Sequence, residues 1–296
     1  MLPDMDSLAL FVRAAELHSL TKAAEVSHIG LAAASRRISL LEHRFKAPLF
    51  ERSPKGVELT PAGQALLAHA KTLLMHVNHM QADMGDHASG RQGSLRIFAN
   101  TSAMTAYLPS DLAEFSAMHP GIRLTIREMW SQSIVNSVLA GDADIGIVLD
   151  GVATDSLSFY PYRIDRLAVV VPPSHPLAAS ESIRFTDVMD YDVAALEGDS
   201  SMMKLVASQA VVYEKTLRLR AQVRSFEAVC RMVQAGLGVG LLPRQAADAL
   251  APGMDLRVYS LEESWAERSM LVCVRPERIT QQAIAALMEH LISVEQ

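Results

Sequence analysis

The sequence lacks any stretch that would carry the chain into or across a membrane. No run of about 18 uncharged apolar residues occurs, so no membrane-spanning helix is expected. The N-terminus carries Asp4, Asp6, Arg13 and Glu16, whereas a secretory signal has a basic start followed by an apolar core. We therefore predict a cytoplasmic protein.

Cysteine is scarce as well. The chain has only Cys230 and Cys273, and they fit neither a metal-ligand spacing nor a disulfide framework. Both have apolar neighbours, which predicts buried and unreactive thiols. A redox-sensing pair is the alternative, and it is uncommon inside cells.

Motifs of catalysis and of cofactor binding are missing too. The sequence has no G-x-S-x-G, no phosphate-binding loop, no H-E-x-x-H and no pair of carboxylates set around a histidine. The glycine-rich run 236–240 ends a predicted helix and leads into a strand, which is the reverse of the order in a dinucleotide-binding loop. We expect no enzyme activity, no catalytic residue, no metal and no cofactor.

Positive charge is in short supply over the whole chain, but it is unevenly distributed. The 27 Lys and Arg are outnumbered by 33 Asp and Glu, which gives a net charge of −6. Residues 1–91 nevertheless hold ten basic against nine acidic residues, and DNA binding needs only a local positive face. The segment 31–60 concentrates the basic side chains Arg36, Arg37, Arg44, Lys46, Arg52 and Lys55.

The first sixty residues predict short helices followed by a hairpin. Ser7 is expected to cap a first helix and Thr21 a very short second one. After a turn, a third helix is predicted over 31–45, and the turn residues 53–56 then separate two short extended runs. This order is typical of a winged helix-turn-helix over residues 1–60. The third helix would bury Ala34, Ile38 and Leu41, at i, i+4 and i+7.

A long helix is predicted to follow over residues 61–88, with Pro61 in its first turn. Its apolar side chains alternate at spacings of four and three, and a single helix would leave this stripe in water. We therefore expect a partner helix from a second subunit. Histidines on or near this helix are expected to be solvated, since no Cys or carboxylate completes a metal-ligand set. The stripe consists of Leu66, Ala70, Leu73, Val77, Met80 and Met84.

Residues 86–93 form the clearest linker of the chain. Beyond them, short β-like runs alternate with helical segments up to a closing helix from about Thr280. This alternation is typical of an α/β domain whose mostly parallel sheet is covered by helices. We assign residues 93–296 to this domain.

These segments together resemble the LysR-type transcriptional regulators. The specific matches are FVRAAELHSLTKAAE, ASRRISLLE and PLFERSPKGVELTPAG, which occur in this order. Looser matches follow in LPSDLAEFSAMHPGIRLTI, ADIGIV, VVPPSHPLA and VQAGLGVGLLP. The resemblance therefore extends over nearly the whole chain.

The resemblance implies a dimer or tetramer that binds promoter double-stranded DNA, with a linker helix that pairs the subunits. It also implies a two-lobed effector domain, similar to periplasmic ligand-binding proteins, that holds a small metabolite between its lobes. Lobe I would comprise about 93–165 and 267–296, and lobe II about 166–266. RNA polymerase is a further expected partner if the regulator activates transcription.

Arg36 is the strongest candidate for reading bases. It lies opposite the buried face of the third helix, and a guanidinium can fork onto guanine or bind a phosphate. Ser35 can donate to a phosphate or a base, and Arg37 lies nearer the flank, where contact with the DNA backbone is expected. A solvated basic face, or surface ion pairs with acidic neighbours, is the alternative. The other expected DNA contacts are Thr21, Lys22, Leu31, Ala32, Arg52 and Lys55.

The start of the third helix departs from the family. Where the family usually has a polar run such as Ser-Gln-Pro or Ser-Gln-Ser, this chain has Gly30-Leu31-Ala32. The lost amide removes a reader of adenine, whereas Leu31 and Ala32 can touch thymine methyl groups. Specificity is therefore expected to depend on apolar contacts, Arg36 and DNA shape.

Polar residues at the carboxyl ends of strands, where helices begin, are expected to form the effector site. The resemblance favours Thr101 and Ser102 above the others, and Lys204 and Arg224 are the nearby charges. For each single residue, an ordinary helix cap is at least as common an explanation. The expected effector-binding residues are Asn100, Thr101, Ser102, Trp130, Ser131, Ser200, Ser201 and Phe226.

The sequence thus predicts a sequence-specific transcriptional regulator whose promoter binding responds to a small-molecule effector. The hypothesis is that the effector closes the two lobes, shifts the angle between dimers and changes DNA bending or spacing. The main alternative is a cytoplasmic small-molecule-binding protein without a productive DNA-binding role. The missing motifs disfavour an enzyme. A stand-alone solute-binding protein leaves the helix-turn-helix unexplained, and a structural DNA-binding protein leaves the α/β half without a purpose.

Overall fold

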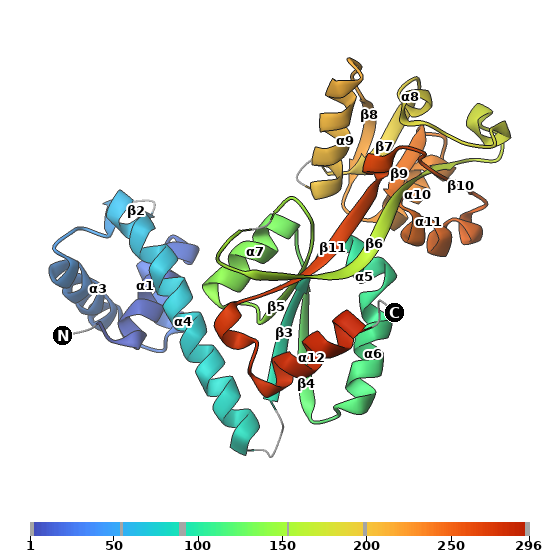
Figure 1. Ribbon diagram of the computed structural model, residues 1–296. Helices are drawn as coiled ribbons and strands as arrows, with labels where there is room; N and C mark the ends of the chain where they lie inside the picture. Colours follow the sequence, from blue (N-terminus) through green and yellow to red (C-terminus); the bar gives the residue numbers. More distant parts are fainter. Residues whose placement is uncertain (1–2, 54–55, 89–92, 153, 198–199, 294–296) are drawn as a thin grey trace. The chain divides into compact units, whose positions relative to one another are not determined.

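The computed structural model describes residues 3–53, 56–88, 93–152, 154–197 and 200–293. The chain divides into two compact units, Met1–Ser89 and Gly90–Gln296 (Figure 1). Among the described residues, no helix is both long enough and apolar enough to cross a membrane.

The described part of the first unit contains helices and one hairpin, in the order that the sequence predicts. The third helix begins and ends at the predicted residues, and it buries Ala34, Ile38 and Leu41 as predicted. These side chains share a core with Phe11 and Phe50, whose rings lie 5.1 Å apart. The elements are α1 (Met5–Leu17), α2 (Leu20–Val26), α3 (Leu31–Phe45), β1 (Phe50–Ser53), β2 (Gly56–Leu59) and α4 (Pro61–Ala88).

The first two helices begin earlier than predicted. Asp4 caps α1 by accepting a 2.8 Å hydrogen bond from the Ser7 amide. Ser19 caps α2 by accepting a 3.3 Å hydrogen bond from the Lys22 amide. The predictions of Ser7 and Thr21 as caps were therefore wrong. A capping residue has extended backbone and accepts from the amide three residues later. Asp4 and Ser19 meet this condition, whereas Ser7 and Thr21 lie inside the helices.

The hairpin is anchored to the end of α1. Its strands pair antiparallel from Phe50 opposite Leu59 to the turn, and the Val57 amide donates to the His18 carbonyl at 3.1 Å. Gly56 has a φ of +131°, and a Cβ there would lie 2.2 Å from the same carbonyl oxygen. Only glycine fits this close approach.

Thr60 joins the hairpin to α4. Its amide donates to the Leu49 carbonyl at 3.1 Å, while its hydroxyl donates to the Pro48 carbonyl at 2.7 Å and accepts from the Gly63 amide at 3.0 Å. A Cβ at Gly63 would lie 2.1 Å from the Leu49 oxygen. The L-T-P-A-G sequence therefore fixes the hairpin against the first turn of α4.

The apolar stripe of α4 divides into two parts. Ala70 is fully buried and Leu66 packs against the core of the first unit. Leu73, Met80 and Met84 are instead 46%, 58% and 59% exposed. The first part of the stripe thus stabilises the core of its own unit, and the second part is exposed apolar surface.

In the described part of the second unit, nine strands form one sheet in the order β4-β3-β5-β11-β6-β9-β7-β8, with β10 paired to β6. β3, β4 and β5 are parallel, and so are β7, β8 and β9. β6 and β11 run antiparallel to their neighbours. The strands are β3 (Gly93–Ala99), β4 (Ile122–Glu128), β5 (Ile145–Leu149), β6 (Ser158–Val171), β7 (Asp192–Leu196), β8 (Arg218–Val223), β9 (Val239–Pro243), β10 (Arg257–Ser260) and β11 (Glu267–Val274).

The prediction of a mostly parallel sheet was wrong because two long strands pass between its halves. β6 pairs with β11 up to Arg166, and with β9 and β10 from Leu167 onward. We call the half that contains β3, β4 and β5 lobe I and the half that contains β7 to β10 lobe II (Figure 1).

Helices cover the sheet of each lobe, and each lobe has its own core. In lobe I they are α5 (Thr101–Ala106), α6 (Leu108–Met118), α7 (Ser131–Ala140) and α12 (Gln282–Ser293). In lobe II they are α8 (Phe185–Val188), α9 (Ser201–Val212), α10 (Phe226–Gln234) and α11 (Arg244–Leu250). Short 3-10 turns cover Pro176–Ala179, Pro252–Met254, Ser264–Ala266 and Pro276–Arg278.

The two cysteines are buried in different cores. Cys230 lies in lobe II, and Cys273 packs on the sheet of lobe I. Burial raises the pKa of Cys230 to about 11 and that of Cys273 to about 12. These positions agree with the prediction of buried thiols. They also place the two cysteines in different cores, which argues against the alternative of a redox-sensing pair.

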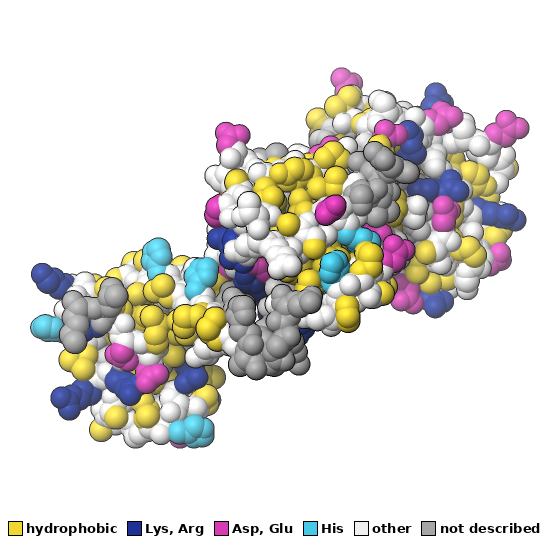
Figure 2. All heavy atoms as spheres, turned by 60° about the horizontal axis from the view of Figure 1, so that its bottom comes forward, with side chains coloured by type: hydrophobic (Ala, Val, Ile, Leu, Met, Phe, Trp, Pro, Cys, Tyr) yellow, Lys and Arg dark blue, Asp and Glu magenta, His cyan; other side chains and the backbone are white. Residues whose placement is uncertain are grey.

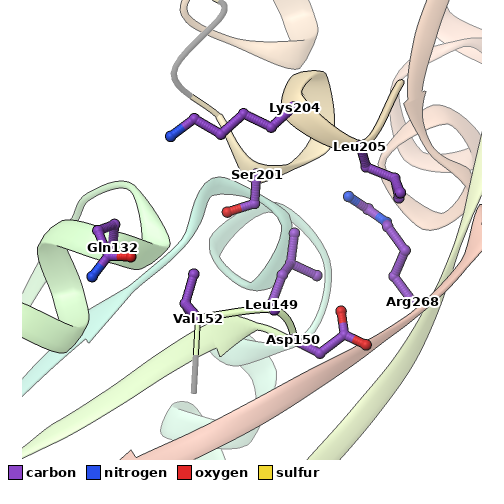
Figure 3. A pocket seen from close by; sticks show the side chains of 9 residues that line it. Gln132, Leu149, Asp150, Val152, Ser201, Lys204, Leu205 and Arg268 are labelled. Carbon is purple, nitrogen blue, oxygen red and sulfur yellow. The ribbon is translucent and has the colours of Figure 1, made fainter. Parts of the chain in front are cut away.

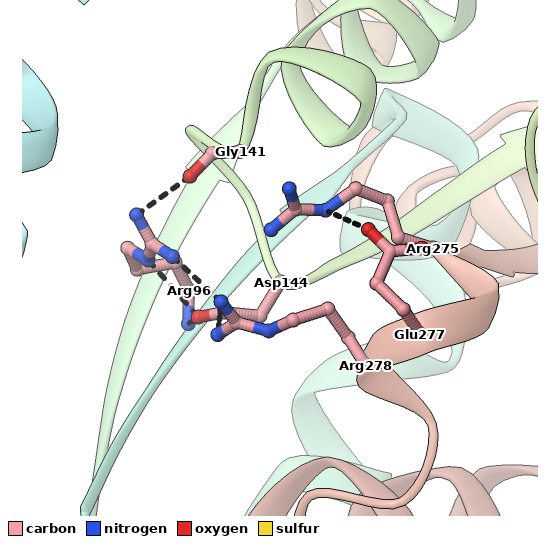
Figure 4. A network of polar contacts seen from close by, with 6 residues as sticks. All are labelled: Arg96, Gly141, Asp144, Arg275, Glu277 and Arg278. Atoms are coloured by element: carbon pink, nitrogen blue, oxygen red, sulfur yellow. Dashed lines mark hydrogen bonds and ion pairs between the residues drawn. The ribbon is translucent and has the colours of Figure 1, made fainter. Parts of the chain in front are cut away.

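A buried carboxylate ties lobe I together (Figure 4). Asp144, 3% exposed, receives hydrogen bonds from the amide and guanidinium of Arg96 at 2.6–3.0 Å and from Arg278 at 2.9 Å. Arg96 also donates to the Gly141 carbonyl at 2.9 Å. The charge of Asp144 is therefore compensated inside the fold, which fixes β3, the entry to β5 and the segment before α12 against one another.

Candidate DNA-binding surface and effector cleft

The outer face of α3 carries the residues expected to read DNA. Ala32 and Arg36 are exposed, Leu31 is 49% exposed, and Ser35 is partly buried. Arg36 forms no ion pair with any described residue. It lies opposite Ala34 on the helix, so its guanidinium is available to a ligand in solution.

The neighbouring basic residues have different surroundings. Arg37 is partly buried, and its guanidinium lies 3.6 Å from the Asp6 carboxylate, which agrees with its expected place on the helix flank. Thr21 and Lys22 are exposed in the first turn of α2. The Lys22 amide is bound by Ser19, so only its side chain is open to a phosphate.

The wing residues are only partly described. The backbone of Arg52 lies in β1 opposite Val57, while its side chain and the whole of Lys55 lie outside the described residues. On the face seen in Figure 2, basic and histidine side chains lie around the edge of the helical unit, whereas acidic and basic groups are interspersed on lobe II.

His43 was not among the DNA contacts expected from the sequence. It is exposed in the last turn of α3, and it follows Arg36 by seven residues, on the same side of the helix. His43 extends the exposed stripe formed by Ala32, Arg36 and Ser39.

Seven of the eight expected effector residues surround one small cavity between the lobes, of about 20 Å³. This volume holds about one water molecule. Phe226 is not among them, because its side chain points inward from the first residue of α10 and is buried in the core of lobe II. The lining residues are Asn100, Thr101, Ser102, Trp130, Ser131, Ser200 and Ser201, with Leu149, Leu196 and Met202.

Most of these polar groups already bind the protein. Asn100 caps α5 and Ser200 caps α9, through the amides of Ala103 and Met203. The Ser131 hydroxyl accepts from the Leu149 amide at 3.2 Å. Their first role is therefore structural, which is the helix-cap explanation that the sequence left open.

Thr101 is occupied in a different way. Its hydroxyl donates to the Glu128 carboxylate at 2.6 Å, so it can offer a ligand only acceptor lone pairs. Glu128 lies at the end of β4 and Thr101 at the start of α5. This bond links the end of β4 to the start of α5, the helix that follows the neighbouring strand β3.

Two larger cavities flank the small one. The first measures about 420 Å³ and the second about 330 Å³, which is within the range of metabolite sites. The first is lined by Gln132, Leu149, Asp150, Gly151, Val152, Ser201, Lys204, Leu205 and Arg268 (Figure 3). The second is lined by Thr101, Glu128, Met129, Trp130, Ser133, Glu197 and Arg224.

The larger cavity draws its walls from both lobes and from the strand between them. Gln132 and Leu149 belong to lobe I, Ser201 and Lys204 to α9 of lobe II, and Arg268 to β11. Arg268 was missed because a single arginine in an apolar strand has no motif. The available signal was the alternation of exposed and buried positions in β11. Arg268 occupies one of the buried positions, where an apolar residue is usual.

Arg268 is held by a buried acidic partner. Its Nη2 binds the Asp165 carboxylate across β6 and β11, and both side chains are almost fully buried. Burial raises the pKa of Asp165, and the positive charge of Arg268 opposes that shift. Nε and Nη1 of Arg268 have no hydrogen-bond partner among the described residues.

A helix-turn-helix with a hairpin, followed by two α/β lobes with cavities between them, defines a ligand-responsive DNA-binding regulator. The chain matches "Bacterial regulatory helix-turn-helix protein, lysR family" over residues 5–64 and "LysR substrate binding domain" over residues 88–296. It therefore belongs to the LysR-type transcriptional regulator family.

Individual relatives agree with this assignment over the full chain. The chain is 26% identical to "Uncharacterized HTH-type transcriptional regulator YbhD" of Escherichia coli (strain K12), over 98% of this chain and 92% of that protein. It is 25% identical to "Probable RuBisCO transcriptional regulator" of Synechocystis sp. (strain ATCC 27184 / PCC 6803 / Kazusa), over 97% of this chain and 85% of that protein.

A solved structure agrees in fold. The crystal structure of full-length CbnR complexed with its target DNA aligns with a TM-score of 0.80, at 20% identity, over 97% of this chain and 98% of that chain. The likeness is to the fold of both units.

Proposed function

We propose that this LysR-type regulator reads promoter DNA with α3 and the hairpin, and that a small-molecule effector between the lobes changes that binding. In this proposal residues 1–60 bind DNA, 61–88 pair subunits and 93–296 bind the effector. Lobe I comprises about 93–165 and 267–296, and lobe II about 166–266.

The observation that carries the effector proposal is the composition of the cavities. Their walls come from lobe I, lobe II and the strand β11 that passes between them. A ligand that contacts all three changes the relative free energy of arrangements in which the lobes are closer or farther apart. Trp130 supports this proposal, since it begins α7 in lobe I and packs against the core of lobe II.

Pairing of subunits is supported by the exposed part of the α4 stripe. Leu73, Met80 and Met84 leave apolar surface in water, and a second copy of α4 would cover it. Pairing also places two copies of α3 on one DNA duplex, which multiplies affinity and sets the spacing of half-sites. A dimer, or a tetramer made of two dimers, is the proposed DNA-binding form.

The remaining parts of the proposal concern partners and location. The protein acts in the cytoplasm, because promoter DNA is its target, and it contacts RNA polymerase if it activates transcription. It acts by binding rather than by catalysis, as expected of a transcriptional regulator, and several polar groups of the small cavity are engaged in helix caps or bound to Glu128.

The test is binding of the purified full-length protein to the intergenic DNA upstream of its own gene, titrated with salt. We expect affinity well above that for random DNA of equal length, with a steep loss as salt rises. Equal affinity for both DNAs at every salt concentration would contradict sequence-specific regulation from this promoter. That result would favour the small-molecule-binding alternative, since Gly30-Leu31-Ala32 lacks the polar readers of other members.

A further inference from the structure

Lobe II contains a further cavity, of about 400 Å³, at the amino ends of its parallel strands. The residues that begin β7 and β8 line it, as does the loop before β9. The cavities between the lobes instead use residues beyond the carboxyl ends of these strands, such as Glu197 and Arg224. At about 3.3 Å per residue, the five residues of β7 separate the two ends by about 15 Å. Among the described residues, this cavity shares none of its lining with those between the lobes, so it is a separate site.

Two arginines of β8, Arg218 and Arg220, bring positive charge to this cavity. Asp192, another lining residue, holds both of them. Its Oδ2 lies 3.2 Å from Nη1 of Arg220, and its Oδ1 lies 3.7 Å from Nε of Arg218. The register of β8 against β7 shifts at Arg220, and a bulge of this kind redirects side chains. Both guanidiniums therefore lie beside one carboxylate, which holds them close together.

Most of the N–H groups on the two guanidiniums are available to a ligand. Each guanidinium carries five, and each donates to a described residue through a single nitrogen, Nη2 of Arg218 to the Asp190 carbonyl and Nη1 of Arg220 to Asp192. Their side chains are 57% and 58% exposed, so a ligand can reach them from solvent. Asp192 thus orients the arginines without occupying most of their donors. With two arginines and one aspartate, the charged lining residues keep an excess of positive charge.

A pair of rings lines the cavity together with the arginines. The ring centroids of His175 and Tyr191 lie 4.5 Å apart in an edge-on arrangement. The Leu177 amide donates to Nδ1 of His175 at 3.2 Å, so the neutral ring carries its proton on Nε2, which can donate to a ligand. Burial lowers the pKa of His175, which favours that neutral ring. Pro172 and Leu237 add apolar surface, and the lining therefore offers hydrogen-bond donors and apolar surface around one volume.

From this arrangement we propose that lobe II binds a phosphorylated small molecule in this cavity, with its phosphate held by Arg218 and Arg220. A phosphate offers three acceptor oxygens and nearly two negative charges, which match two guanidinium forks better than the two oxygens of a carboxylate do. The volume lies within the range of metabolite sites, so an organic group accompanies the phosphate. That group packs against Tyr191, Pro172 and Leu237. The site goes beyond the proposed function, because it lies outside the cavities between the lobes.

The experiment measures thermal unfolding of the full-length protein with defined probes, at constant ionic strength in a phosphate-free buffer. The probes are adenosine monophosphate, glycerol phosphate and phosphotyrosine. Adenosine, glycerol and tyrosine are their unphosphorylated counterparts, and inorganic phosphate lacks the organic group. We expect at least one phosphate ester to raise the unfolding temperature in a saturable way, its counterpart to have no such effect, and inorganic phosphate to bind more weakly.

Variants locate the binding. Arg218→Gln and Arg220→Gln are each expected to weaken the stabilising ester about tenfold, because each removes a charge-assisted hydrogen bond. Either variant leaves one guanidinium beside Asp192, so the fold is retained. Arg231→Gln is the matched control, since Arg231 is 56% exposed in lobe II and lines none of these cavities. Lys204→Gln should also keep the affinity for the ester, because Lys204 lines the larger cavity between the lobes.

The outcomes separate this proposal from the proposed function. It is overturned if no ester stabilises the protein more than its unphosphorylated counterpart, if inorganic phosphate binds as tightly as the esters, or if Arg218→Gln and Arg220→Gln behave like Arg231→Gln. A loss of affinity in Lys204→Gln alone would place the ester between the lobes and overturn the proposal as well. The readout needs no DNA, so a failure of specific DNA binding rejects the proposed function and leaves this result unaffected.

Discussion

Replacing Arg36 by Ala tests the DNA-reading face of α3 most directly. Arg36 is exposed and forms no ion pair with any described residue, so its removal costs the fold little. We expect the free energy of unfolding to change by no more than about 0.5 kcal/mol, as for surface substitutions in general. Any loss of DNA affinity then reports contact with DNA.

The expected magnitude depends on what Arg36 contacts. A bidentate contact with guanine contributes about 1–3 kcal/mol of discrimination, which corresponds to about 5–150-fold in affinity for the specific site and little for random DNA. A phosphate contact weakens both DNAs alike and lowers the slope of log K against log salt by about 0.9, or about 1.8 for the two copies in a dimer.

The assay is fluorescence anisotropy on the specific site and on random DNA at several salt concentrations. Lys71→Ala is the matched control, because it also removes a basic residue from the first unit. Lys71 Nζ lies 2.8 Å from the carboxylate of Glu16 on α1. Arg37→Ala provides a comparison, because it also breaks the pair with Asp6. If Arg36→Ala keeps wild-type affinity and salt slope while the wild type binds specifically, the placement of α3 against DNA is wrong.

Three further predictions concern the hairpin, the linker helix and the thiols. Gly56→Ala should lower the free energy of unfolding of the first unit by about 2 kcal/mol or more, because Gly56 has a positive φ and a Cβ there would clash with His18. Gly30→Ser is the control, since the space around Gly30 is open, and equal chemical denaturation curves for the two variants would contradict this account. Leu73→Glu combined with Met80→Glu should shift sedimentation toward monomers, whereas Asn78→Glu on the opposite side of α4 should leave pairing intact; unchanged pairing in the double variant would place the interface elsewhere. At pH 8 the native thiols should alkylate at least about a hundredfold more slowly than free cysteine, since raising the pKa lowers the fraction of reactive thiolate; rapid labelling of the folded protein, followed by mass spectrometry, would exclude the buried positions.

Local patterns in the sequence predicted the order of the elements in the first unit, although not the first residues of α1 and α2. The period of Ala34, Ile38 and Leu41 gave the bounds and buried face of α3, because helical periodicity depends on neighbours within one turn. The cap of α1 was misplaced by one turn, since Ser7 and Asp4 both carry capping oxygens and the choice between them is made by packing of the helix on its core.

The sequence also predicted which polar residues gather between the lobes, because each follows a strand and begins a helix. It did not give the volume that they enclose. Seven of the eight surround space for about one water molecule, and hydrogen bonds to neighbouring amides and to Glu128 occupy several of them.

By itself, the sequence determined the order of the helices, the hairpin, the apolar stripe of α4 and the alternation of strands and helices, all of which depend on residues close together in the chain. Only the tertiary structure decided that the sheet is mixed and that Arg268 reaches the larger cavity. Asp165 and Arg268 are 103 residues apart, and they meet because β6 and β11 pair across the lobes. Contacts of this kind arise from long-range strand pairing, which no local pattern encodes.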